Sequence, residues 1–397
     1  MIRVPPMRFS LLASTAFALV GCLAADDVPA QEFGHSAYHD FRVVTVAEGL
    51  VNPWAIAFLP GGDMLVTERP GRLRIVRGGD LLSDPVEGVP EVFAQGQGGL
   101  LDVVPHPDFA SNRLLYLSYS KPLGDEQSTT AVVRGRFDND RLTDVEEIFE
   151  ADSRGRGHYG SRLAFHDGYL FITVGDRQAS PSGDLEAHPA QDLSNHHGVV
   201  IRLHEDGRVP DDNPFVGQEG ALPEIYSYGH RNPQGMAIHP GTGAVWITEH
   251  GPQGGDELNL IKPGANYGWP VIGFGVNYGS GAAIHEGTRR DGMEQPTRVW
   301  VPSIATSGLT FYTGDAFPNW DGFLLSGGLN GTRLVLLHMD GESVTREETL
   351  VGDRGRIRDV RVGPDGFIYL AVDERRGAPT PVIRLEPIVR QEVTRDH

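Results

Sequence analysis

A short pattern recurs six times along the chain and restricts its fold more than any other feature. Each repeat has an alternating apolar stretch, a turn rich in Gly, Asp or Asn, a second alternating stretch, and then a third. Alternation with a period of two, broken by turn residues, is typical of β-hairpins. The first two stretches lie in residues 55–69, 103–120, 162–176, 236–250, 309–327 and 360–374, and the third in 72–76, 130–137, 199–203, 257–261, 333–337 and 382–386.

Six such units predict an all-β fold, a six-bladed β-propeller of four-stranded antiparallel blades over residues 41–390. A single blade cannot bury both of its faces, so neighbouring blades pack around an axis. The 397-residue chain is also rich in turn residues, with 51 glycines and 28 prolines. Long insertions lengthen some repeats, and we expect them to gather on one face over the axis; they are residues 178–198, 204–229 and 262–287.

The N-terminus predicts export from the cytoplasm. Arg3 and Arg8 precede an apolar run over residues 9–21. This run is too short for an ordinary membrane-spanning helix, but it suits the core of a signal peptide. We therefore expect a signal peptide over residues 1–21.

The single cysteine of the chain follows this apolar run directly. The sequence 19-LVG-21 before Cys22 resembles a bacterial lipobox, in which the cysteine is lipidated and becomes the mature N-terminus. We expect a lipoprotein of the periplasm, attached to the membrane only through a lipid on Cys22, with residues 22–40 as a flexible tether. The alternative is ordinary cleavage after Ala24 or Ala25, which removes Cys22.

Charge excludes one class of partner. The chain has 34 Lys and Arg against 53 Asp and Glu, a formal net charge of −19, and no run of basic residues. A nucleic-acid-binding protein needs a basic face to neutralise phosphates, so we expect no nucleic-acid partner. Any anionic ligand must be held by a local group of arginines that acts against the overall charge.

One histidine lies in an unusual setting. His158 is surrounded by Gly155, Gly157 and Gly160, immediately before a predicted strand. Glycine allows the backbone to approach a ligand closely, but it also simply makes turns. From the residues alone, His158 is either an incidental loop residue or a side chain that the fold presents.

Other polar groups near predicted strand ends have complementary chemistry. Arg231, Arg356 and Arg358 suit carboxylates, although solubility is the usual role of a surface arginine. Gln97 and Asn232 are neutral donor–acceptor groups suited to carbonyls or hydroxyls.

Carboxylates also occur beside flexible glycine-rich backbone in residues 251–268. Asp256 and Glu257 are the acidic residues of this segment. Carboxylate oxygens mixed with main-chain carbonyls are typical ligands of calcium. The segment is not an EF-hand loop, so this signal is weak by itself.

Taken together, five motifs in one order resemble the soluble PQQ-dependent sugar dehydrogenases, most closely their bacterial aldose sugar dehydrogenase branch. PQQ, pyrroloquinoline quinone, is a tricarboxylate redox cofactor. The resemblance covers roughly residues 41–387. The motifs are 96-GQGGLLDVVPHPDF-109, 157-GHYGSRL-163, 229-GHRNPQGMA-237, 249-EHGP-252 with 256-DELN-259 and 264-GANYGWP-270, and 356-RIRDVRVGPDG-366.

This resemblance implies an activity and a set of residue roles. The anomeric carbon of an aldose sugar is oxidised to a lactone, with hydride transfer to PQQ, calcium as Lewis acid, and an external quinone or cytochrome as electron acceptor. His158 matches the catalytic base, and Asp176 matches an acid that orients its imidazole. The matched cofactor contacts are Gln97, Arg231, Asn232, Tyr278, Arg356 and Arg358. The matched calcium ligands are the main-chain oxygens of Gly251 and Pro252 at one site, and Glu257 with the carbonyl of Tyr267 at a second.

One position departs from the family pattern. The family usually has a lysine after the second strand of the fifth blade, whereas this chain has Asn330. We expect the loss of that charge to weaken PQQ binding and a lysine at this position to tighten it, unless Arg333 reaches in instead. We expect a monomer. Two other functions remain open at this stage, a calcium-dependent propeller lactonase or esterase and a catalytically silent sugar- or ligand-binding propeller.

Overall fold

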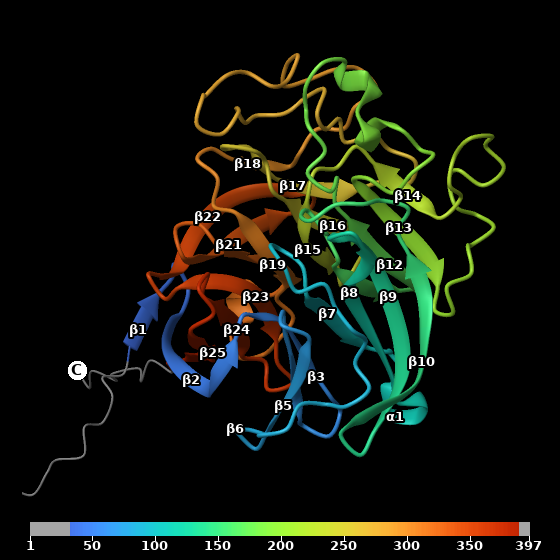
Figure 1. Cartoon of the computed structure of the whole chain (residues 1–397). Coiled ribbons are helices and arrows are strands. Elements are labelled where there is room, and N and C mark those ends of the chain that lie inside the picture. Colours follow the sequence, from blue (N-terminus) through green and yellow to red (C-terminus); the bar gives the residue numbers. More distant parts are fainter. Residues whose placement is uncertain (1–31, 389–397) are drawn as a thin grey trace, which may run out of the picture. The chain divides into compact units, whose positions relative to one another are not determined.

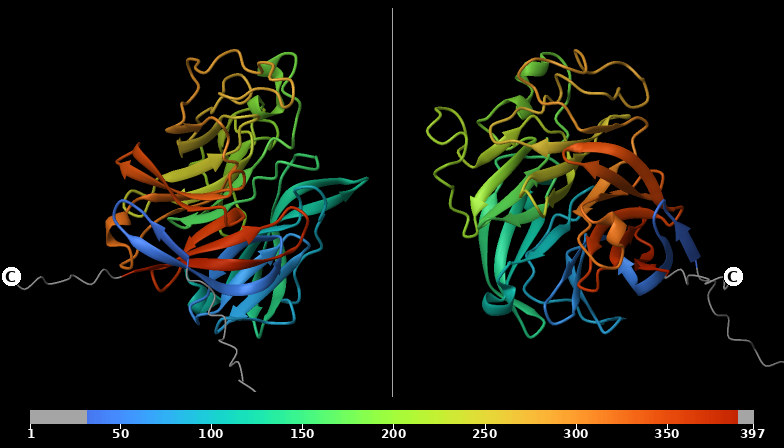
Figure 2. Two further views of the ribbon diagram at one scale, coloured as in Figure 1. Left: turned by 90° about the vertical axis from the view of Figure 1, so that its left-hand side faces the viewer. Right: turned by 180° about the vertical axis from the view of Figure 1, so that it is seen from behind.

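The computed structural model describes residues 32–388, which form a six-bladed β-propeller (Figure 1). Each predicted repeat is one blade, and its three stretches are the first three strands of an antiparallel sheet. Five of the sheets have four strands, and the sixth has a fifth strand at its edge. The first strands of neighbouring blades contact one another and so surround the axis. Figure 2 shows the same arrangement from two further directions. The predicted fold is confirmed.

The four strands of a blade follow one another along the chain, apart from the last strand of blade 6. Blade 1 contains β3 (Pro53–Phe58), β4 (Met64–Glu68), β5 (Arg72–Arg77) and β6 (Asp80–Leu81). Blade 2 contains β7 (Leu100–Pro105), β8 (Leu114–Gly124), β9 (Gln127–Asp138) and β10 (Arg141–Glu150). Blade 3 contains β11 (Leu163–His166), β12 (Tyr169–Val174), β13 (Val199–His204) and β14 (Ile225–Tyr228). Blade 4 contains β15 (Pro233–Ile238), β16 (Val245–Glu249), β17 (Asp256–Ile261) and β18 (Arg298–Trp300). Blade 5 contains β19 (Thr306–Phe311), β20 (Leu324–Gly328), β21 (Arg333–Asp340) and β22 (Ser343–Gly352). Blade 6 contains β23 (Arg356–Val362), β24 (Ile368–Asp373), β25 (Pro379–Pro387) and β2 (Asp40–Val51). The short helical segments of the described chain are α1 (Phe109–Asn112), η1 (Leu185–Ala187), η2 (Pro189–Gln191) and η3 (Pro318–Trp320).

The sixth blade is closed by strands from both ends of the described chain. β25 ends the last repeat, and β2, from the N-terminal side, pairs with it as the fourth strand. Residues Glu32–His35 form β1, which pairs with β2. The predicted tether is therefore wrong for this segment, because its backbone groups are paired at the edge of a sheet. The predicted signal peptide and residues 22–31 lie outside the described residues.

A tight turn in the third blade sets the position of the site. β11 and β12 are joined by Asp167 and Gly168 alone, whose φ angles are +50° and +77°. Two consecutive positive φ angles define the type I′ turn, whose twist matches that of a hairpin. β12 therefore runs from this turn to the opposite end of the blade, where Asp176 lies two residues beyond its last residue.

Two of the three predicted insertions lie together, and the third does not. Residues 178–198 meet residues 262–287, and Gln191 Nε2 donates to the carbonyl of Trp269 at 2.7 Å (Figure 1). Residues 205–224 follow β13, which runs antiparallel to β12 and so ends at the far side of the blade. The expectation that all three gather over the axis is wrong for this segment, which instead contacts the second blade through Glu205.

Apolar side chains between the blades form the core. Leu65, Leu115, Leu170, Val245 and Ile368 occupy corresponding positions in five repeats, and all are buried. Burying one such side chain contributes about 1.5–3 kcal/mol, so packing between blades holds the ring together. No helix within residues 32–388 has the length and apolarity needed to cross a bilayer.

Candidate active site

Two cavities adjoin at the end of the propeller where the second strands of the blades finish. The arginine cavity has a volume of about 270 Å³ and is lined by four arginine side chains. The histidine cavity has a volume of about 420 Å³ and contains His158. Gln97 and His250 lie on the walls of both, so the two spaces are neighbours. The predicted residues divide between them, with Asn232, Arg356 and Arg358 on the first and His158, Asp176, Arg231 and Tyr278 on the second.

His158 is fixed in orientation by its neighbours. Its backbone N–H donates to Gln97 Oε1 at 2.8 Å, and its Nδ1 lies 2.5 Å from Asp176 Oδ1. Asp176 also accepts the indole N–H of Trp269 at 2.7 Å and the backbone N–H of Gln178 at 2.9 Å. Because an ionised carboxylate only accepts hydrogen bonds, Nδ1 carries the proton and Nε2 is the basic nitrogen.

Burial keeps this imidazole neutral. It lowers the pKa of His158 below the ordinary value of 6.5, and Asp176 offsets only part of that effect. Burial alone would raise the pKa of Asp176, but His158 and Arg231 hold it below its ordinary value. The pair therefore combines a neutral imidazole with an ionised carboxylate, the state required of a general base.

A buried arginine supports the loop that carries His158. Arg177 donates to the carbonyls of His158 at 3.1 Å, Gly155 at 3.0 Å and Ser128 at 3.3 Å. Its guanidinium also lies 3.8 Å from the centre of the Tyr159 ring. These contacts hold His158 at a φ of +45°, a left-handed conformation that is unfavourable for a residue with a side chain. The conformation of the loop at His158 is therefore held by specific contacts.

The arginine cavity contains more positive than negative charge. Arg356 donates to the carbonyl of Leu329 at 3.0 Å, and its Nε lies 3.4 Å from Asp373. Arg358 donates to Gln234 Oε1 at 3.1 Å and lies 3.6 Å from Asp373. Burial, together with the neighbouring arginines, lowers the pKa of Arg358 to about 9. Among the described residues that line this cavity, Asp373 is the only one with a carboxylate.

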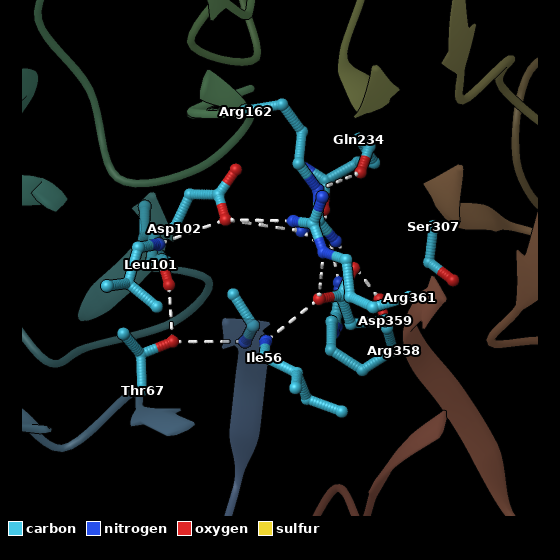
Figure 3. A network of polar contacts seen from close by, with 12 residues as sticks. Ile56, Thr67, Leu101, Asp102, Arg162, Gln234, Ser307, Arg358, Asp359 and Arg361 are labelled. Atoms are coloured by element: carbon cyan, nitrogen blue, oxygen red, sulfur yellow. Dashed lines mark hydrogen bonds and ion pairs between the residues drawn. The ribbon is translucent and has the colours of Figure 1, made fainter. Parts of the chain in front are cut away.

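A second group of charges lies along the axis next to this cavity (Figure 3). Arg162 is buried and lies 2.9 Å from Asp359 and 3.7 Å from Asp102. Arg361 contacts the same two carboxylates at 2.9 and 3.1 Å. Arg162 also donates to the carbonyl of Arg358 at 3.1 Å, so this axial network positions the backbone of one residue of the arginine cavity.

A narrow space of about 20 Å³ lies where the sequence predicts calcium. Gly251, Pro252, Glu257 and Tyr267 line it together with Glu249. Burial and the nearby charge of Glu249 raise the pKa of Glu257 to about 8. Within residues 32–388 no three His, Cys, Asp or Glu side chains are arranged to hold a metal ion, so a cation here would depend on backbone carbonyls as well as these carboxylates.

Some predicted residues are occupied in other ways. The guanidinium of Arg231 donates to the carbonyl of Gly251 at 2.7 Å, one of the predicted calcium ligands. The carboxylate of Asp256 accepts from Ser303 Oγ and from the backbone N–H of Gly251, which makes it a structural residue. Tyr278 is 68% exposed at the rim of the histidine cavity.

The position that departs from the family lies beside the arginine cavity. Leu329 is part of its wall, but among the lining residues of the described chain neither Asn330 nor Arg333 is found. Asn330 Nδ2 donates to the carbonyl of Ser303 at 3.1 Å. The side chain of Arg333 folds over Gly331.

The sequence analysis missed several residues that line the two cavities. Most of them follow the second strand of a blade, and this common position in the repeats would have indicated them. The second strand of a blade ends at the site, and four repeats carry charged residues there, in 67-TER-69, 174-VGDR-177, 248-TEH-250 and 372-VDERR-376. Asp176 is the only one of these that the sequence predicted. The residues missed are Arg69, Arg177, His250, Asp373 and Arg375, together with Trp269 and Gln178.

The chain is similar to proteins of known class over most of its length. Residues 50–384 match the family model described as glucose/sorbosone dehydrogenase. The chain is 46% identical over 345 residues to the aldose sugar dehydrogenase YliI of Escherichia coli K12, covering 85% of this chain and 91% of that protein. A crystal structure of the soluble aldose sugar dehydrogenase of E. coli in its apo-form superposes with a TM-score of 0.82 at 42% identity, covering 88% and 100%. The PQQ-bound aldose sugar dehydrogenase of Streptomyces coelicolor superposes with a TM-score of 0.70 at 29% identity, covering 87% and 98%.

Proposed function

Because the chain belongs to the glucose/sorbosone dehydrogenase family, we propose that it oxidises the anomeric carbon of aldose sugars to lactones with PQQ and calcium. The observation that carries this proposal is the position of the His158–Asp176 pair in a cavity that adjoins the arginine cavity. A sugar in the histidine cavity and an anionic cofactor in the arginine cavity would then be neighbours.

The arginine cavity suits a polycarboxylate. Within the described chain, Nε of Arg358 on this cavity is buried without a hydrogen-bond partner, as is Nε of Arg231 on the adjoining histidine cavity. Guanidinium groups bind carboxylates through paired hydrogen bonds. The residues that would hold PQQ are Gln97, Arg231, Asn232, Tyr278, Arg356 and Arg358.

The narrow space beside it suits a cation. Glu257 and Glu249 place two carboxylates close together in a buried setting. Burial, and after it the charge of Glu249, raise the pKa of Glu257, and a cation would offset both effects. Gly251 and Pro252 would supply carbonyl oxygens to one calcium, and Glu257 with the carbonyl of Tyr267 would supply a second. When bound, PQQ supplies the carbon that accepts hydride and calcium supplies Lewis-acid polarisation.

The part of this chain in the reaction is proton transfer. His158 Nε2 accepts the proton of the anomeric hydroxyl, and Asp176 stabilises the imidazolium that forms through its contact with Nδ1. Trp269 holds the other oxygen of that carboxylate, so the imidazole keeps its orientation during the transfer. A positioned general base of this kind contributes about 10²–10⁴-fold to the rate.

The test is an absorbance titration of the metal-free protein with PQQ, with and without calcium, followed by dye-linked oxidation of a panel of aldoses. We expect saturable PQQ binding that requires calcium and dye reduction that requires both. A lactonase would hydrolyse lactones without PQQ, and a silent binding protein would reduce no dye. Either result would overturn the proposal.

We also propose that the protein is exported and carries a lipid on Cys22, which the apolar run and the lipobox-like sequence before it support. Mass spectrometry of the mature N-terminus tests this directly. A diacylated Cys22 is expected, and an unmodified N-terminus beyond Ala24 would contradict it.

A further inference from the structure

Two arginines of the arginine cavity have no role in the assignment above. Arg69 follows β4 of the first blade, and Arg375 follows β24 of the sixth. Both line the cavity that also contains Arg356 and Arg358. Because the second strands of these blades end at the same place, side chains far apart in the sequence reach one space.

The contacts of these two arginines leave most of their binding capacity unused. The side chain of Arg69 donates once, from a terminal nitrogen to the carbonyl of Gly96 at 2.9 Å, and its buried Nε has no hydrogen-bond partner in the described structure. Arg375 is exposed beside the cavity, and its charge helps to lower the pKa of Arg356, after the larger effect of burial. Neither forms a salt bridge among residues 32–388.

The charge of the cavity wall is therefore unbalanced. Four guanidinium groups face one carboxylate, that of Asp373, which leaves three positive charges in a protein with a net charge of −19. Like charges held together in a partly buried space are unfavourable unless something neutralises them. Three carboxylates would do so.

We propose that Arg69 and Arg375 bind carboxylate groups of PQQ and complete, with Arg356 and Arg358, a site for a tricarboxylate. This inference rests on the proposed function, since it assigns further residues to the same cofactor. It also explains how the chain dispenses with a lysine at position 330, because these two arginines supply positive charge from other blades.

The experiment measures PQQ binding directly, without sugar or turnover. The variants Arg69→Gln and Arg375→Gln are titrated with PQQ at saturating calcium and followed by absorbance. A charge-assisted hydrogen bond contributes enough to change affinity about tenfold or more, so we expect Kd to rise about tenfold in each variant. Arg376→Gln is the matched control, since it removes the same charge from the adjacent residue, which is not among the described residues that line the cavity, and its Kd should stay within about twofold.

Further measurements test whether a change in Kd comes from the lost charge or from a damaged fold. The dependence of Kd on salt should be weaker in Arg69→Gln and Arg375→Gln than in the parent, because fewer charges are screened. Arg69→Lys, which keeps the charge, should recover part of the affinity. Thermal unfolding of each variant reports whether the fold is intact, and Arg375→Gln changes an exposed residue and so carries the test if Arg69→Gln is unstable.

The possible results separate this inference from the proposed function. If the parent protein binds PQQ and both glutamine variants bind within twofold of it, the inference is overturned and the proposed function stands. If the parent protein does not bind PQQ at all, both fall. Arg376→Gln could also lose as much affinity for PQQ as Arg375→Gln does. The effect would then come from the overall charge of the protein, and the inference would be overturned.

Discussion

Two groups of arginines lie side by side on the axis of this propeller, and they differ in how they are neutralised. In the axial network, Arg162 and Arg361 face two carboxylates, those of Asp102 and Asp359, at distances of 2.9 to 3.7 Å (Figure 3). In the arginine cavity, four guanidinium groups face Asp373 alone among the described residues on its wall.

The two carboxylates of the axial network also accept backbone hydrogen bonds from other blades. Asp359 also accepts the backbone N–H of Ile56 at 2.9 Å, and Asp102 accepts that of Leu163 at 2.9 Å. The axial network thus joins blades 1, 2, 3 and 6, and its two positive charges are balanced by two negative charges within the protein. Buried atoms without a hydrogen-bond partner occur in both groups of the described chain, for example Nη1 of Arg162 and Nε of Arg358, so the difference between the groups lies in the balance of their charges. We infer that the balanced cluster serves the fold, and we propose that the unbalanced cluster beside the cavity serves a ligand.

The largest expected effect separates activity from folding. His158→Gln should lower kcat of the reconstituted protein by about 10²–10⁴-fold, because the base is lost. Its thermal unfolding should match the parent, since the side chain lies in a cavity wall rather than between blades. Near-parental kcat at saturating sugar would mean that His158 only lines the pocket.

A substitution in the axial network should instead lower the stability of the fold. Arg162→Met leaves Asp102 and Asp359 with one partner fewer in a buried setting and should cost about 3–5 kcal/mol of unfolding free energy. Arg375→Gln, in the unbalanced cluster, should change it by no more than about 0.5 kcal/mol. Chemical unfolding of both variants checks the contrast, and equal losses would remove the distinction between the two clusters.

Calcium should stabilise the region around Glu257 without affecting the axial network. A ligand at 100 times its Kd adds about 2.7 kcal/mol to the stability of the folded state. Chelation followed by dialysis should therefore lower Tm, and added calcium should restore it. The matched variant Glu257→Gln should show a smaller calcium effect, and an unchanged Tm in the parent after chelation would count against both calcium sites.

The pH profile tests the environment of His158. Burial lowers the pKa of this imidazole below 6.5, so protonation should inactivate the base only at more acidic pH. We expect kcat/KM for the sugar to fall on the acid side with a midpoint below 6.5 and to be constant from there to neutral pH. A midpoint above 6.5 would contradict a base governed by burial, and the residual rate of His158→Gln should lack this limb.

The smallest expected effect concerns Asn330. The sequence predicts that a lysine here would tighten PQQ binding, but the structure places Asn330 against Ser303, outside the described lining of the cavity. Since arginines already supply the charge, Asn330→Lys should change the Kd of PQQ by less than about threefold, or about 0.7 kcal/mol. A tenfold gain in the same titration would show that the cavity still lacks positive charge.

The parts of the molecule that sequence predicted are those with a local signal. Alternation and turn residues indicated every blade, whereas the glycine-rich setting of His158 left its role open and only the family resemblance assigned one. The contact of Trp269 with Asp176 joins residues 93 positions apart, and that of Arg162 with Asp359 joins opposite parts of the ring. The alternation of residues within a repeat does not indicate such contacts, because they form only when the blades have closed into a ring.

The most direct test of the account is anaerobic mixing of the PQQ- and calcium-loaded protein with an aldose, followed by the absorbance of the bound cofactor and the yield of lactone. We predict that one equivalent of cofactor is reduced for each lactone formed, and that His158→Gln slows this step without weakening PQQ binding. Sugar added to the fully loaded protein with no change in the cofactor, or lactone formed without its reduction, would contradict it.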